Sequence, residues 1–226
     1  MVQFSALSQF NLSAKQAWSS LPRWCSGMAI AVGLLMIATP AQAHHALGGK
    51  TPTNFFEGFL SGLAHPIIGI DHFAFVVAVG LLAAVMQQRI LLPVVFVLAA
   101  MAGTGLHLMR IDLPGSELFV GASIVTVGLL LALKNRPQPL ITIALGAIAG
   151  IFHGYAYGES IVGADMTPLV AYLAGFTVIQ LVVALSAFSV GQRLITRSAE
   201  AFPLALRFAG FTLCGFGVAF LTSGLK

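Results

Sequence analysis

The composition of this 226-residue chain excludes a soluble globular protein, because 58% of its residues are hydrophobic and only 8% are charged. Soluble domains carry about 25% charged residues. The formal net charge is +4, but the basic residues fall in short gaps between apolar runs and form no cluster with interleaved aromatics, so we expect no nucleic-acid partner. The composition predicts an all-α integral membrane protein whose first partner is the lipid bilayer.

The N-terminal segment has the features of a secretory signal peptide. Lys15 and Arg23 precede the apolar run 27–38, which is too short to span a membrane comfortably. The sequence Ala-Gln-Ala at 41–43 then provides a cleavage site. We therefore predict a signal peptide over 1–43 and a mature chain that begins outside the cytoplasm. An uncleaved anchor is the alternative.

The remaining chain, 44–226, is predicted to be a single transmembrane domain of six helices. The expected spans lie near 55–86, 90–109, 116–134, 139–157, 168–190 and 203–222. The first is too long for one straight span, and it contains Pro66 and Gly69. Because proline lacks an amide hydrogen and clashes with the preceding turn, we expect this helix to be broken at Pro66/Gly69.

The distribution of charge predicts the orientation in a bacterial inner membrane. With the mature N-terminus outside, the cytoplasmic gaps lie near 87–89, 135–138 and 191–202. Six basic residues then fall on the cytoplasmic side, namely Arg89, Lys134, Arg136, Arg193, Arg197 and Arg207, against Lys50, Arg110 and Lys226 outside. This bias agrees with the positive-inside rule and predicts that both mature termini are extracytoplasmic.

The first group of candidate metal ligands lies in the segment 65–72, which contains His65, Asp71 and His72. Imidazole and carboxylate groups suit a divalent ion such as Ni, Co, Zn, Cu or Fe. On a straight helix the two histidines would be about 10.5 Å apart along the axis, too far to share one ion readily. Either the helix break brings them together, or they belong to successive sites along a path. The structural alternative is a pair of buried histidines that are satisfied by hydrogen bonds.

The second group lies in the segment 152–159, where His153 and Glu159 accompany Gly154 and Gly158. Two glycines four residues apart also permit close helix packing, which explains the glycines but not the histidine or the glutamate. Three further histidines are candidate metal ligands, and each also has an interpretation that involves no metal. His107 near the outer end of the second span can serve as an interfacial hydrogen-bonding residue, and His44 and His45 can capture metal or result from the cleavage site.

The motifs His-Pro-x-x-Gly-x-Asp-His at 65–72 and Phe-His-Gly-x-Ala-x-Gly-Glu at 152–159 resemble those of the HupE/UreJ family. The resemblance extends over essentially the whole mature chain. It implies a secondary permease for nickel, sometimes cobalt, that serves hydrogenase or urease maturation. It also implies that His65, Asp71, His72, His153 and Glu159 handle the metal, which is substrate rather than a resident cofactor.

Two other functions stay open from the sequence: a membrane metalloenzyme and a non-transporting metal-binding assembly subunit. The chain lacks the HExxH and GxSxG motifs, so we expect no enzyme, and it lacks a P-loop, so we expect no direct ATP coupling. The sequence does not decide between a monomer and a homo-oligomer, nor whether a metallochaperone is a partner.

Overall fold

Every regular element in the described part of the chain is a helix. The computed structural model describes residues 50–86, 90–135, 137–198 and 201–224, all within one compact unit, Pro40–Lys226. The predicted signal peptide, its cleavage site, His44 and His45 lie outside the described residues.

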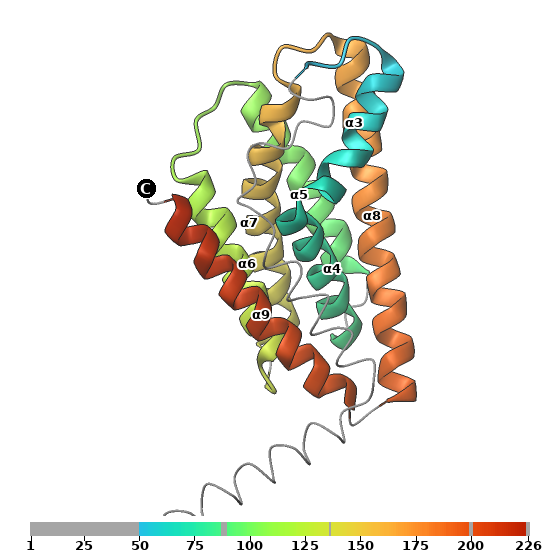
Figure 1. Ribbon diagram of the computed structural model, residues 1–226, viewed down its shortest axis with the longest axis vertical. Coiled ribbons are helices and arrows are strands. Elements are labelled where there is room, and N and C mark those ends of the chain that lie inside the picture. Colours follow the sequence, from blue (N-terminus) through green and yellow to red (C-terminus); the bar gives the residue numbers. More distant parts are fainter. Residues whose placement is uncertain (1–49, 87–89, 136, 199–200, 225–226) are drawn as a thin grey trace, which may run out of the picture. The chain divides into compact units, whose positions relative to one another are not determined.

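The helices follow the apolar segments expected from the sequence. Their bounds, in the order of Figure 1, are α3 (Phe55–Ile68), α4 (Ile70–Val85), α5 (Leu91–Leu108), α6 (Ser116–Ala132), α7 (Pro139–Gly158), the short 3₁₀ helix η1 (Glu159–Ile161), α8 (Met166–Arg197) and α9 (Ala201–Gly224). Four of them, α5, α7, α8 and α9, are long and apolar enough to cross a membrane. The pair α3–α4 passes the same criteria as one bent segment, and α6 is an apolar helix of 17 residues.

The chain bends by 77° between α3 and α4. Gly69 separates the two helices in an extended conformation, and its amide still donates to the carbonyl of His65 at 3.2 Å. Pro66 lies inside α3, near its end. The break is therefore at Gly69, three residues beyond the proline that helped to predict it.

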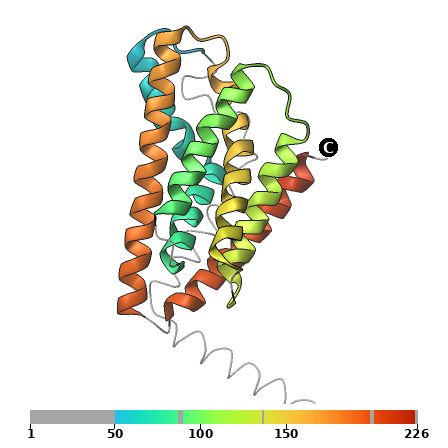
Figure 2. The same cartoon turned by 180° about the vertical axis from the view of Figure 1, so that it is seen from behind.

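Glycines bring the helices together in pairs. A side chain at Gly62 of α3 would collide with the backbone of Tyr172 in α8, and one at Gly154 of α7 would collide with the backbone of Ala100 in α5. A Cβ at Gly128 of α6 would lie 2.7 Å from the carbonyl oxygen of Gly210 in α9, and these two helices run side by side in both views (Figures 1 and 2). Close backbone approach through small residues is typical of helices that pack within a membrane.

α8 is longer than the sequence predicted. We expected a span over 168–190 and a cytoplasmic gap over 191–202, but the helix continues to Arg197. The side chain of Gln192 donates a 2.6 Å hydrogen bond to the carbonyl of Ala84 in α4, so this extension is packed. Hydropathy falls at the end of the apolar run, whereas helical hydrogen bonding continues through Gln, Arg and Leu, which are good helix formers.

Large apolar side chains cover the outside of the described unit. Leu140, Met166 and Phe208, for example, are 75%, 72% and 60% exposed. A soluble protein would place charges on such a surface, whereas in a bilayer lipid covers it. With four to five apolar segments of spanning length, this surface identifies a multi-pass membrane protein.

Candidate metal site

The break at Gly69 brings the two histidines of the first motif together. The rings of His65, at the end of α3, and His72, at the start of α4, are stacked with centroids 5.8 Å apart. A straight helix would hold them nearly twice as far apart along its axis. Of the two arrangements left open by the spacing, the chain thus adopts the one in which the break makes the rings neighbours.

Asp71 and Gly69 both lie next to the ring of His72. The Asp71 carboxyl is buried, and its Oδ2 lies 3.7 Å from Nδ1 of His72. Gly69 has φ −72° and ψ 96°, which any residue can adopt. Its role is to leave space, because a Cβ there would lie 2.7 Å from Cδ2 of His72 and 3.3 Å from Oδ1 of Asp71.

His153 brings the second motif to the first. It is fully buried on α7, and its ring stacks on Phe75 of α4 at 4.1 Å and lies 5.7 Å from the ring of His72. Its Nε2 is 2.9 Å from the hydroxyl of Ser123 on α6. Its Nδ1 has no hydrogen-bond partner among the described residues. One nitrogen is therefore held by the protein, and the other is available as a donor or acceptor.

Tyr157 lies at the centre of the three histidines. Its ring is fully buried and makes edge contacts with His72, His65 and His153 at centroid distances of 4.5, 5.3 and 6.2 Å. Within the second motif it occupies a position at which the motif specifies no residue. The signal that could have identified it is its position one helical turn after His153, on the same face of α7.

The three histidines and Asp71 form a row rather than a cage. Within the described ranges, no group of three or more His, Cys, Asp or Glu side chains is arranged to hold a single metal ion. Structural metal sites enclose the ion with four ligands. Neighbouring imidazoles with fewer ligands at each position suit an ion that must bind weakly enough to leave.

No contact among the described residues joins Glu159 to the row of histidines. It is exposed, and it begins η1 directly after α7. Nearby, the hydroxyl of Ser160 is 2.8 Å from that of Tyr172, and Tyr172 donates to the carbonyl of Tyr157 at 3.2 Å. These bonds anchor the end of α7 to α8 and hold Tyr157 in place.

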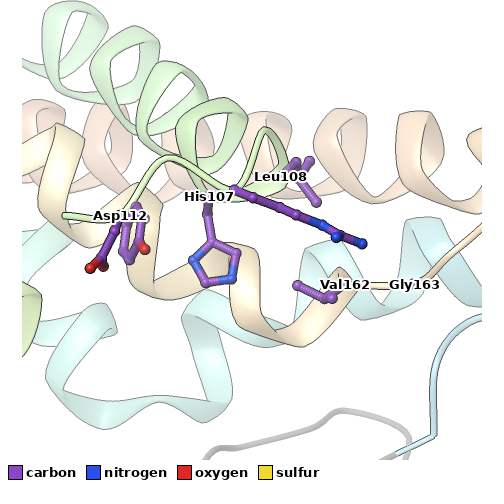
Figure 3. A pocket seen from close by; sticks show the side chains of 7 residues that line it. His107, Leu108, Asp112, Val162 and Gly163 are labelled. Carbon is purple, nitrogen blue, oxygen red and sulfur yellow. The ribbon is translucent and has the colours of Figure 1, made fainter.

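His107 lies apart, in a pocket of about 300 Å³ that Arg110, Asp112 and Tyr155 also line. Figure 3 shows the His107 ring between Asp112 and Val162. The ring contacts that of Tyr155 at 4.5 Å. α5 ends here in a Schellman turn, in which Arg110 has a positive φ of 58° and the amides of Arg110 and Ile111 return to the last turn of the helix.

Comparisons with known proteins agree with the motifs. The model of the HupE / UreJ protein family matches residues 32–220. The protein HupE of Rhizobium leguminosarum bv. viciae is 32% identical over 150 residues, which cover 65% of this chain and 74% of that protein. No solved structure matches. The match spans both histidine motifs and all the helices that position them, and the chain therefore belongs to the HupE/UreJ family.

Proposed function

We propose that this protein is a secondary permease that imports a divalent transition-metal ion, Ni²⁺ or Co²⁺, across the bacterial inner membrane in support of hydrogenase or urease maturation. HupE/UreJ proteins are an accessory or transport family rather than a catalytic one. The observation that carries the proposal is the row His65, His72 and His153, whose rings follow one another inside an apolar helical bundle. Ionisable side chains are costly inside a membrane and mark ion pathways there.

The chemistry of the row favours borderline divalent ions. Imidazole nitrogens with one carboxylate suit Ni²⁺ and Co²⁺, whereas a Cu(I) site would need thiolates or thioethers. Cys214 is a free cysteine on α9, where its Sγ bonds the carbonyl of Val125 at 3.5 Å, so it contributes no thiolate to the row.

The membrane potential is a sufficient driving force for import. A divalent cation that moves inward gains about 4.6 kcal/mol per 100 mV, twice the value for a single charge. This coupling needs no nucleotide site, in keeping with the absence of a P-loop from the sequence.

The proposed topology has six spans, with both mature termini outside. α3–α4 forms one broken span, α6 is the shortest, and α5, α7, α8 and α9 are the other four. We expect alkaline phosphatase fused at Lys226 to be active and phosphatase fused near Arg197 to be inactive. We also expect sequencing of the mature protein to begin at His44. The opposite fusion pattern, or a chain that retains 27–38, would contradict this topology.

Uptake of radioactive Ni²⁺ into proteoliposomes tests the function directly. The purified protein should accumulate Ni²⁺ under an inside-negative potential, and competing metals should rank its selectivity. Single Ala substitutions at His65, Asp71, His72 and His153 should nearly abolish uptake at unchanged membrane abundance, and Glu159→Ala should cost less because Glu159 is exposed. The control is Thr212→Ala, since that hydroxyl only bonds the carbonyl of Phe208 in its own helix.

The outcomes also separate the alternatives. Parental uptake in all five site variants would mean that the histidines are structural. Stoichiometric binding of Ni²⁺ without accumulation would identify a non-transporting assembly subunit. We expect His44 and His45 to contribute only to the capture of Ni²⁺ at low concentration. Their double Ala variant should therefore have a higher apparent KM for Ni²⁺ and an unchanged limiting rate.

A further inference from the structure

Gln180 is a fully buried amide that the family motifs do not include. It lies on α8 with 0% exposure, and neither Nε2 nor Oε1 has a hydrogen-bond partner among the described residues. Burial of an unsatisfied amide costs free energy, and a hydrocarbon side chain of the same size would avoid that cost. A buried amide of this kind is expected to bond to something else, such as water or an ion.

Gln180 lies at the level of the helix break. Tyr172, Phe176, Gln180 and Ala184 follow one another at single helical turns on one buried face of α8. Gly62 of α3 contacts the backbone of Tyr172 and Phe176, and Gly80 of α4 contacts the backbone of Ala184. The amide therefore lies between the contact that Gly62 of α3 makes and the contact that Gly80 of α4 makes, at the level of the segment in which the chain bends.

The same level on α7 also carries an unsatisfied polar atom. The ring of Tyr157 on α7 packs against Phe176 on α8 at 4.7 Å. The two helices run in opposite directions (Figure 1), so one turn beyond this contact brings the chain to His153 on α7 and to Gln180 on α8. The His153 Nδ1 and the Tyr157 hydroxyl both lack a partner among the described residues.

The next layer is apolar. Val79 and Leu82 on α4, with Ala184 on α8, are each at most 1% exposed. The polar groups of Gln180, His153 and Tyr157 that lack partners among the described residues are thus followed by an apolar layer.

We propose that Gln180 lines a hydrated transit position at the helix break, where a divalent ion that leaves the histidines exchanges imidazole for amide oxygen and water. This inference rests on the proposed permease function. An amide oxygen is a harder and weaker ligand than imidazole, which favours release of a borderline ion. The amide NH₂ donates to water that completes the coordination of the ion.

Two matched glutamine variants on α8 test the transport role in the purified full-length protein with NiCl₂. Gln180→Leu should lower the limiting rate of Ni²⁺ uptake about tenfold, as expected for loss of one interaction on the path, and should leave the melting temperature unchanged or higher. Gln192→Leu removes a hydrogen bond that the protein makes. It should lower the melting temperature and leave the rate per folded protein unchanged.

Thiol labelling tests the hydration without reliance on flux. In a background without Cys25 and Cys214, the thiol introduced by Gln180→Cys should react with a small water-borne thiol reagent, and NiCl₂ should protect it. The thiol introduced by Ala184→Cys, one turn further on the same buried face, should stay unreactive. Equal reactivity at the two positions would overturn the hydrated position.

The outcomes of the two tests are separable. A parent protein that transports Ni²⁺ while Gln180→Leu transports equally fast would overturn this inference and leave the permease intact. A parent that transports no divalent ion would overturn the permease, and with it the transit role of Gln180.

Discussion

Gly69 determines the position of the His72 ring because it has no side chain. Because its backbone angles are ordinary and a Cβ would lie 2.7 Å from the ring, Gly69→Ala should push His72 away from His65 without unfolding the protein. We expect the apparent KM for Ni²⁺ to rise about tenfold or more, the range typical of a displaced metal ligand, with little change in melting temperature. Gly215→Ala is the control, since no atom lies within 4 Å of a Cβ there. Parental transport by Gly69→Ala would show that the ring position does not matter.

Ser123 orients His153 through the 2.9 Å contact between its hydroxyl and Nε2. Loss of such a partner typically weakens metal affinity 10- to 100-fold. Ser123→Ala should therefore raise the apparent KM for Ni²⁺ by about tenfold, and Ser123→Thr should restore part of the affinity. The matched control is Ser189→Ala, because Ser189 is exposed and bonds only the carbonyl of Leu185. An apparent KM for Ni²⁺ that is the same in the parent, Ser123→Ala and Ser189→Ala would mean that Ser123 has no positioning role.

The candidate residues divide into those that a sequence can reveal and those that need a structure. His65, Asp71, His72 and His153 stand out because charged and imidazole groups are rare in apolar segments. Tyr157, Ser123 and Gln180 do not, because tyrosine, serine and glutamine occur in many membrane helices without a function. The sequence indicated Tyr157 only through its position one helical turn after His153. The significance of Ser123 and Gln180 depends on what packs across from them, which only tertiary structure shows.

At the scale of the helix, the pair α5–α7 depends on Gly154. A Cβ at this position would collide with the carbonyl of Ala100, and the Gly154 carbonyl accepts a 2.7 Å hydrogen bond from Thr104. Gly154→Ala should destabilise the protein by about 2 kcal/mol, in the range for overpacking, and lower its melting temperature in detergent. Gly105→Ala on α5 meets no neighbour and should leave stability equal or higher. Equal stability of both variants would contradict close packing at Gly154.

The sequence predicted most of the helix bounds, but it located the break between α3 and α4 less well. Apolar runs bounded by charge, Pro or Gly predicted segments such as 139–157, and α7 occupies Pro139–Gly158. The sequence named both Pro66 and Gly69 as breakers, but the chain bends only at Gly69. Proline disturbs the turn that precedes it, but this turn stays helical in α3, where Gly62 packs against the backbone of α8.

For the whole molecule, uptake should depend on external pH. Imidazole must be unprotonated to bind a metal, and its unperturbed pKa is about 6.5. At subsaturating Ni²⁺, the rate should therefore fall as the external pH drops from about 7.5 to about 5.5. Saturating Ni²⁺ should suppress most of this loss, because the metal then outcompetes protons. A rate that is independent of pH at low Ni²⁺ would argue against imidazole ligands.

The break at Gly69 also has an electrostatic consequence. A helix carries a partial negative charge of about half an elementary charge at its C-terminus and an equal positive one at its N-terminus. At Gly69 the C-terminus of α3 meets the N-terminus of α4 inside the bundle, and the Asp71 carboxylate lies in the first turn of α4. When ionised, it offsets the positive end and leaves the negative end of α3 beside His65. The ionised Asp71 carboxylate and the C-terminal end of α3 together thus favour cations at this point. Asp71→Asn, which removes the charge, should weaken uptake of every divalent cation to a similar degree.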